Sequence, residues 1–205
     1  MARIRPISSS GRPEPVALHD RAMDNLRFIR ETMERAGSFT AVSGWGSILT
    51  GVTALVAAGI ASLVEGSLAW LLVWTGEAML AIGIGAWAVV MKARAAGMPL
   101  LSGPGRKVAL SLMPPIVAGG VLTLVLFQVG LPQLLPGMWM LLFGVGIVAA
   151  GSYSVRIVPV MGLSFMVLGA IAFMLPMAWA NGVMALGFGG LHILFGFLIA
   201  RRYGG

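Results

Sequence analysis

Residues 42–91 read VSGWGSILTGVTALVAAGIASLVEGSLAWLLVWTGEAMLAIGIGAWAVVM, a stretch that contains two acids and no Lys or Arg. The pair Glu65–Gly66 divides it into two apolar runs, and each run is long enough to cross a bilayer as an α-helix of about 20 residues. Because the polar pair between them is so short, the two runs predict a transmembrane helical hairpin.

Four more apolar runs follow this hairpin. The whole chain of 205 residues is 58% hydrophobic and 10% charged, far from the composition of soluble domains. We therefore predict an all-α, polytopic bundle of six transmembrane helices within residues 42–200. The expected spans are 42–64, 67–91, 107–130, 137–153, 157–175 and 179–200. The one long connection, residues 92–106, includes a Gly- and Pro-rich stretch that is not expected to form a continuous helix.

The positions of the fourteen Lys and Arg residues indicate the orientation of the spans. Seven precede the first span, four lie between the second and third or at the first residue of the third, one lies between the fourth and fifth, and two follow the sixth. Since Lys and Arg are enriched on the cytoplasmic side, both termini are expected there, with residues 201–205 as a cytoplasmic tail. We expect an inner-membrane protein whose net charge of +7 reflects topology and not nucleic-acid binding.

The first 37 residues have a different character. Residues 1–15 predict a disordered basic tail without the apolar core of a signal peptide, and residues 16–37 predict an amphipathic interfacial helix. From Asp20 to Arg35, four acids balance four Arg, so anionic lipid is not expected to be the main attraction. We expect this helix to dock onto protein, either the bundle itself or a partner in a larger membrane complex. Its apolar stripe comprises Leu18, Ala22, Leu26, Ile29 and Met33.

The 29 glycines are spaced in a way that favours close helix packing. No two are four residues apart, whereas ten pairs are seven apart, as in Gly130–Gly137–Gly144–Gly151. A seven-residue repeat keeps small residues on one face of a helix in a left-handed crossing. The spacing therefore predicts a tight bundle with little room for a wide pore.

Glu77 and His192 are the residues most able to carry chemistry inside the membrane. Glu77 is the only acid within a predicted span, and His192 lies at a similar depth in the last one. A buried carboxyl group is costly, so Glu77 must face a polar partner. We expect His192 to be that partner, with a Ser or Thr hydroxyl or a backbone carbonyl as the alternative. The pair is either a proton or ion site, or a neutral clasp between helices.

Pro114, Pro115, Gly119 and Gly120 predict a break or a kink in the third span. A broken helix exposes carbonyl groups to an ion or substrate, whereas a kink serves packing alone. No metalloprotease, Walker or serine-hydrolase motif is present, and the chain has no Cys. We therefore expect no enzyme activity, no cofactor and no metal site.

Three segments carry a resemblance to a known group of proteins. They are DNLRFIRETMERAGSFTAVSGWG (residues 24–46), VRIVPVMGLSFMVLGA (155–170) and GGLHILFGFLIARRYGG (189–205). The chain resembles a family of small, functionally uncharacterised six-span bacterial membrane proteins. The resemblance implies the fold and a bacterial inner membrane, and it suggests that Phe28, Arg30, Trp45, His192 and the RRYGG end belong to a shared pattern. It implies no activity.

Three functions remain open at this point. The first is a structural, accessory or interaction subunit that docks through residues 16–37. The second is a conductor of protons or small solutes that uses Glu77 and His192. The third is a membrane-embedded enzyme, which the missing motifs disfavour.

Overall fold

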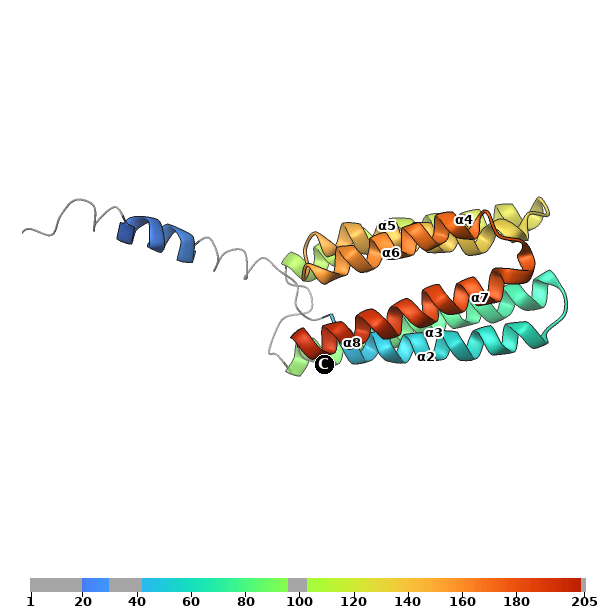
Figure 1. Ribbon diagram of the computed structural model, residues 1–205, viewed down its shortest axis with the longest axis horizontal. Coiled ribbons are helices and arrows are strands. Elements are labelled where there is room, and N and C mark those ends of the chain that lie inside the picture. Colours follow the sequence, from blue (N-terminus) through green and yellow to red (C-terminus); the bar gives the residue numbers. More distant parts are fainter. Residues whose placement is uncertain (1–19, 30–41, 96–102, 204–205) are drawn as a thin grey trace, which may run out of the picture. The chain divides into compact units, whose positions relative to one another are not determined.

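The computed structural model describes residues 20–29, 42–95 and 103–203, and every regular element in this part of the chain is helical (Figure 1). The chain divides into two units, residues 1–37 and 38–205. The second unit is an all-α helix bundle, as expected. Its elements are α2 (Gly44–Leu63), α3 (Ser67–Ala95), α4 (Gly103–Gln128), η1 (Pro132–Leu134), α5 (Leu135–Gly151), α6 (Ile157–Ala172), η2 (Met177–Trp179), α7 (Ala180–Met184), η3 (Ala185–Leu191) and α8 (His192–Tyr203).

The first hairpin shows how local sequence sets the helix ends. Ser43 is the N-cap of α2, because its side-chain oxygen accepts a hydrogen bond from the backbone N–H of Gly46 at 3.1 Å. The helix ends where Val64 adopts an extended conformation. Gly66 then has a φ of +87°, a conformation that favours glycine, and the chain reverses into α3.

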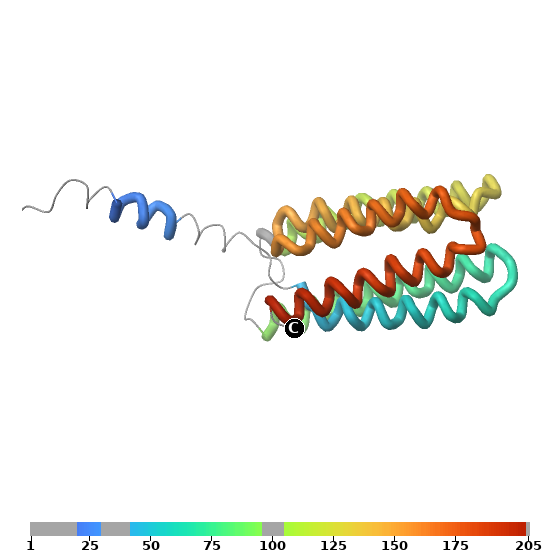
Figure 2. The backbone as a smooth tube through the Cα atoms, in the orientation of Figure 1, coloured from blue at the N-terminus to red at the C-terminus, as the bar shows by residue number. Residues whose placement is uncertain are grey.

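The six helical rods form two layers of three (Figures 1 and 2). In one layer α2 packs between α3 and the continuous rod made by α7, η3 and α8. In the other layer α5 packs between α4 and α6. The last rod also contacts α5 and α6, so it joins the layers. The first layer is thus built from both ends of the bundle sequence, and the second is built from its middle.

Glycines spaced by seven residues lie at one close helix contact in each layer. On α5 and α6, a methyl group placed on Gly144 would lie 2.6 Å from the Gly162 carbonyl oxygen, and one on Gly137 would lie 2.9 Å from that of Gly169. In the other layer, a methyl group on Gly51 of α2 would lie 2.7 Å from the Gly189 carbonyl oxygen. These glycines therefore allow backbone-to-backbone contact between antiparallel helices, as their spacing predicted.

Five helical stretches in the described residues are long and apolar enough to cross a membrane. This makes the chain a multi-pass membrane protein. The sixth helix, α6, has 16 residues and is shorter than the expected span because it ends at Ala172. Its length of about 24 Å compares with a hydrocarbon thickness of about 30 Å.

Two other boundaries differ from expectation. Helix α3 continues through residues 92–95, and α4 begins at Gly103, so both ends of the expected 92–106 connection are helical. Pro104 fits there because the first turn of a helix tolerates a residue without an N–H. Residues 96–102 lie outside the described part.

The charges of the bundle are divided between its two ends. The successive rods run in alternating directions, which brings the end of α3, the start of α4, the α5–α6 turn and the end of α8 together (Figure 1, left). All Lys and Arg of the described bundle lie at this end, namely Lys92, Arg94, Arg106, Lys107, Arg156, Arg201 and Arg202. Glu65 lies in the α2–α3 turn, at the opposite end. We call the end that carries the Lys and Arg residues the basic end.

Candidate functional site: polar groups inside the bundle

Glu77 lies on the face of α3 that packs against α2. It follows Trp70 and Trp74 at helical spacing, and all three side chains are buried. Only 9% of Glu77 is exposed. Its Oε1 lies 2.8 Å from the Thr53 hydroxyl on α2, so the polar partner is a Thr hydroxyl, one of the two alternatives expected for Glu77.

The contacts of the Thr53 hydroxyl also indicate which protonation state of Glu77 fits the structure. Its oxygen is 2.9 Å from the Thr50 carbonyl oxygen as well as 2.8 Å from Glu77 Oε1, yet a hydroxyl has only one hydrogen to donate. If Glu77 carries a proton, it donates to Thr53, and Thr53 donates to Thr50. This is the arrangement in which both contacts are hydrogen bonds, and it favours a neutral carboxyl group that clasps α2 to α3.

His192, the expected partner of Glu77, lies in a different environment. No hydrogen bond or ion pair joins the two side chains, so the expectation of a direct pair is wrong. The His192 ring is surrounded by three Phe rings, with centroid separations of 5.4 Å to Phe143, 5.2 Å to Phe165 and 6.2 Å to Phe188. It is 7% exposed, and its Nδ1 has no hydrogen-bond partner. The Phe188 carbonyl interacts with the ring without the geometry of a hydrogen bond.

A π-helical segment, η3, comes immediately before His192. A methyl group on Gly187 of this segment would lie 2.7 Å from the Met140 sulfur on α5, and Gly189 approaches Leu55 on α2. The π-helical turns of η3 therefore lie where the last rod contacts α2 in its own layer and α5 in the other layer. Such segments often occur at functional sites, but here three Phe rings surround the imidazole, and no polar side chain in the described residues forms a hydrogen bond with its Nδ1.

A polar cluster near the end opposite the basic end was not anticipated from the sequence. Asn181 Oδ1 accepts hydrogen bonds from the indole N–H groups of Trp70 at 2.7 Å and Trp74 at 3.2 Å. The Asn181 amide donates to the Ser62 hydroxyl at 3.3 Å. The ring of Trp70 also stacks on Trp139 of α5, with centroids 5.7 Å apart and an interplanar angle of 2°. One amide thus links α7 to both helices of the first hairpin.

Two tryptophans near that end, Trp70 and Trp179, have different environments. Trp70 is only 5% exposed and is a core residue, whereas Trp179 is 63% exposed, as an interfacial anchor would be. The signal in the sequence was the spacing of Trp70, Trp74 and Glu77 along one face of α3. A carboxyl group that must be buried implies that the aromatic residues one and two turns away are buried with it.

The prolines and glycines of the third span do not break its helix. Helix α4 runs without interruption through Pro114, Pro115, Gly119 and Gly120, so of the two alternatives expected, a break or a kink, the break is wrong. The Gly119 carbonyl accepts a hydrogen bond from the Thr123 hydroxyl at 2.6 Å and is not presented to a substrate. Pro115 lies against the Gly146 position of α5, which gives it a packing role.

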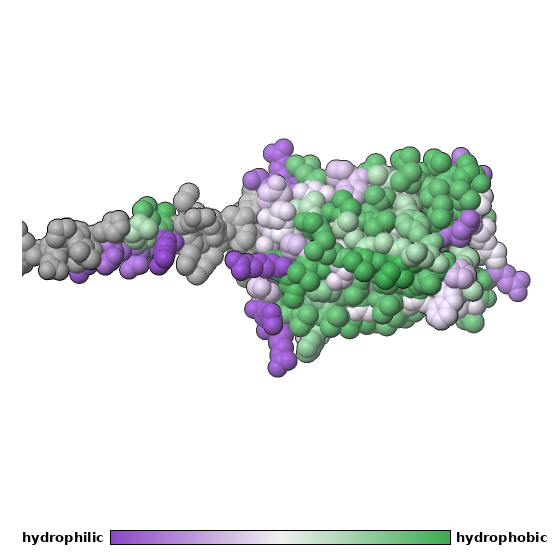
Figure 3. All heavy atoms as spheres, turned by 45° about the horizontal axis from the view of Figure 1, so that its top comes forward, coloured by the Kyte–Doolittle hydropathy of each residue, from purple (hydrophilic) through white to green (hydrophobic). Residues whose placement is uncertain are grey.

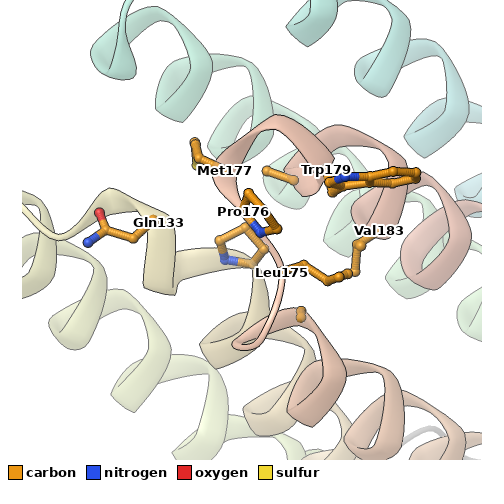
Figure 4. Close-up of a pocket in the computed structure, with 9 residues that line it drawn as sticks. Gln133, Leu175, Pro176, Met177, Trp179 and Val183 are labelled. Carbon is orange, nitrogen blue, oxygen red and sulfur yellow. The ribbon is translucent and has the colours of Figure 1, made fainter.

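The cavity in Figure 4 is too small to hold a substrate. It lies beside the α6–α7 turn and is lined mainly by apolar side chains, with Gln133 on one side and Trp179 on the other. Its volume of about 10 Å³ has room for about one water molecule. No group of three His, Cys, Asp or Glu that could bind a metal occurs in the described residues.

The N-terminal unit is described at residues 20–29, which are helical and exposed throughout. Leu26 and Ile29 are 61% and 52% exposed. Apolar and charged side chains lie on different sides of this helix (Figure 3). Leu18 and Met33, at the two ends of the expected stripe, lie outside the described residues.

No protein-family profile, curated protein or solved structure matches this chain. The resemblance to six-span bacterial proteins therefore stays a prediction. What the fold and the interior polar groups define is an all-helical, multi-pass membrane protein with closely packed helices.

Proposed function

We propose that the protein is a structural or accessory subunit of the bacterial inner membrane that docks onto a protein partner through residues 16–37. The observation that carries this proposal is the exposed apolar stripe on the N-terminal helix, including Leu26 and Ile29. The described part of this helix has two acids and two Arg, so its charge is balanced. A balanced helix gains little from an anionic membrane surface, which supports docking onto protein.

The interior of the bundle supports the same proposal. Glu77 is engaged by Thr53, His192 is enclosed by Phe rings, and Asn181 is engaged by two indoles. The buried polar groups therefore serve helix contacts, which is the role of polar groups as glue in membrane bundles.

The docking proposal is tested with the full chain in its native membrane. We expect mild detergent to extract the wild-type protein as a complex larger than the bundle alone. The double variant Leu26→Glu and Ile29→Glu should migrate as the free bundle. Arg27→Gln, on the polar side of the same helix, is the matched control and should keep the complex. Migration of the wild type as the free bundle would contradict the docking proposal.

We propose six crossings with both termini cytoplasmic, because the Lys and Arg of the bundle share one end. A reporter that is active only in the cytoplasm, fused after Gly205, should be active. Export of that reporter would contradict the proposed orientation.

Proton conduction is the second candidate, and the buried acid Glu77 is the observation that favours it. The Glu77–Thr53 clasp argues against it. We expect proteoliposomes that contain this protein alone to show no proton or cation flux above that of the lipid. A flux that disappears in Glu77→Gln would establish conduction instead, because Gln keeps the shape of Glu but cannot ionise.

A further inference from the structure

The basic end of the α4–α6 layer brings together positive side chains from two elements. Lys107, in the first turns of α4, places its ammonium group 5.3 Å from the ring centroid of Tyr153, which follows α5. The turn that carries Tyr153 also carries Arg156, and Arg106 precedes Lys107. The cation–π contact therefore holds the start of α4 beside the α5–α6 turn.

These positive charges are exposed, and no acid in the described residues is paired with them. Arg106, Lys107 and Arg156 are exposed, and none makes an ion pair within the described residues. The bundle has only two acids, Glu65 at the opposite end and Glu77 in mid-helix. This surface consequently suits an anion, and Arg and Lys side chains suit phosphate in particular.

An exposed apolar stripe begins on α4 one helical turn after Arg106. Leu110, Met113, Val117 and Val121 follow it at spacings of three and four residues, and so they share one side of α4. Each is between 56% and 59% exposed. A basic group at the head of an apolar stripe matches the two parts of a phospholipid, a charged headgroup and an acyl chain.

We propose that this surface binds an anionic phospholipid, with the headgroup phosphate on Arg106, Lys107 and Arg156 and an acyl chain along the α4 stripe. A soluble phosphate compound would use only the basic residues, whereas a phospholipid uses the whole surface. Basic sites between helices at this membrane depth are suited to such headgroups. The site is independent of the proposed accessory function, because it requires only that the bundle lies in a bilayer.

The test measures lipids retained by the purified protein in native mass spectrometry. The probes are dioleoyl phosphatidylglycerol, which is anionic, and dioleoyl phosphatidylcholine, which has the same chains and no net charge. We expect the wild type to retain the anionic lipid preferentially. Each basic side chain removed should weaken its binding about fivefold, so Lys107→Gln with Arg156→Gln should weaken it about twenty-five-fold.

The matched control removes two positive charges from the same end of the other layer. Arg201→Gln with Arg202→Gln should keep the preference, because these residues lie at the end of α8. Equal retention of the two lipids by the wild type, or equal loss in the two double variants, would overturn the proposal. Glycerol phosphate tests for a soluble ligand, and displacement of the bound lipid by this compound at millimolar concentration would also overturn it.

The Lys107–Tyr153 contact provides a second pair of variants. Tyr153→Phe keeps the ring and should retain the lipid as well as the wild type does. Tyr153→Leu removes the ring and should weaken retention severalfold, since Lys107 is then no longer held beside the α5–α6 turn. Equal retention in the two variants would show that the contact does not organise the site and would overturn this part of the proposal.

Discussion

Replacing Gly144 by Ala tests whether the α4–α6 layer depends on direct backbone contact between α5 and α6. The added methyl group would lie 2.6 Å from both the Gly162 carbonyl oxygen and Met166 Cγ, and 2.9 Å from the Met166 backbone nitrogen. Carbon contacts are normally about 3.5–4.0 Å. Two of these three atoms belong to the backbone of α6, so the methyl group fits only if α5 and α6 separate by about 1 Å.

The expected magnitude comes from comparison with Gly83 on α3, where an added methyl group meets nothing within 4 Å. Both substitutions gain the same helix propensity, up to about 1 kcal/mol. The difference between them therefore isolates the clash. Overpacking of this kind costs about 1–3 kcal/mol, and we expect Gly144→Ala to have a free energy of unfolding lower than that of Gly83→Ala by this amount.

The measurement is unfolding by SDS in mixed micelles, followed by the loss of helical circular dichroism. Gly144→Ala should unfold at a lower SDS fraction than the wild type, and Gly83→Ala should match or exceed the wild type. Gly162→Ala should resemble Gly144→Ala, because its methyl group would lie 2.7 Å from the Gly144 carbonyl oxygen. Equal unfolding midpoints for Gly144→Ala and Gly83→Ala would refute the reasoning.

Three other substitutions address the buried polar groups, each measured in the same unfolding assay. His192→Leu removes a ring nitrogen without a hydrogen-bond partner and should raise the free energy of unfolding by about 1 kcal/mol; a loss would mean that the imidazole is needed. Asn181→Leu leaves two buried indole N–H groups without an acceptor and should lower the free energy of unfolding by at least about 2 kcal/mol. An unchanged free energy of unfolding would show that Asn181 does not link these helices. Glu77→Gln should keep the free energy of unfolding within about 1 kcal/mol of the wild type. Glu77→Leu leaves Thr53 without its partner on α3 and should lower the free energy of unfolding by about 1–3 kcal/mol. Equal decreases in the two variants would contradict the neutral clasp.

The class of fold could be predicted because hydrophobic length and glycine spacing act along a single helix. The apolar runs correspond to the helical rods, and many of the glycines at spacing seven lie at the close contacts of α2 with the last rod and of α5 with α6, whereas others, such as Gly76 and Gly83, meet no neighbouring helix. The segment before His192 gave no comparable signal. A π-helix depends on how neighbouring helices fit, and the apolar pattern of residues 185–191 does not distinguish it from an α-helix.

The expected pair of Glu77 and His192 failed for a geometric reason. Counting residues from the membrane faces gives the depth of a side chain but not the direction in which it points. Glu77 faces α2, whereas His192 faces the Phe residues of α5 and α6. The direction of Glu77 was available from Trp70 and Trp74, which share its face of α3.

The layer formed by α2, α3 and the last rod has a consequence for the order of assembly during synthesis. Its hairpin is made first, yet the amide that accepts the indole hydrogens of Trp70 and Trp74 belongs to Asn181, more than a hundred residues later. Gly44 and Gly51 of α2 likewise face a rod that is translated last. Helices α4, α5 and α6 are consecutive, so they can complete their layer as they emerge. If synthesis stopped before α7, the α4–α6 layer would therefore be assembled, whereas α2 and α3 would lack their contacts with the last rod.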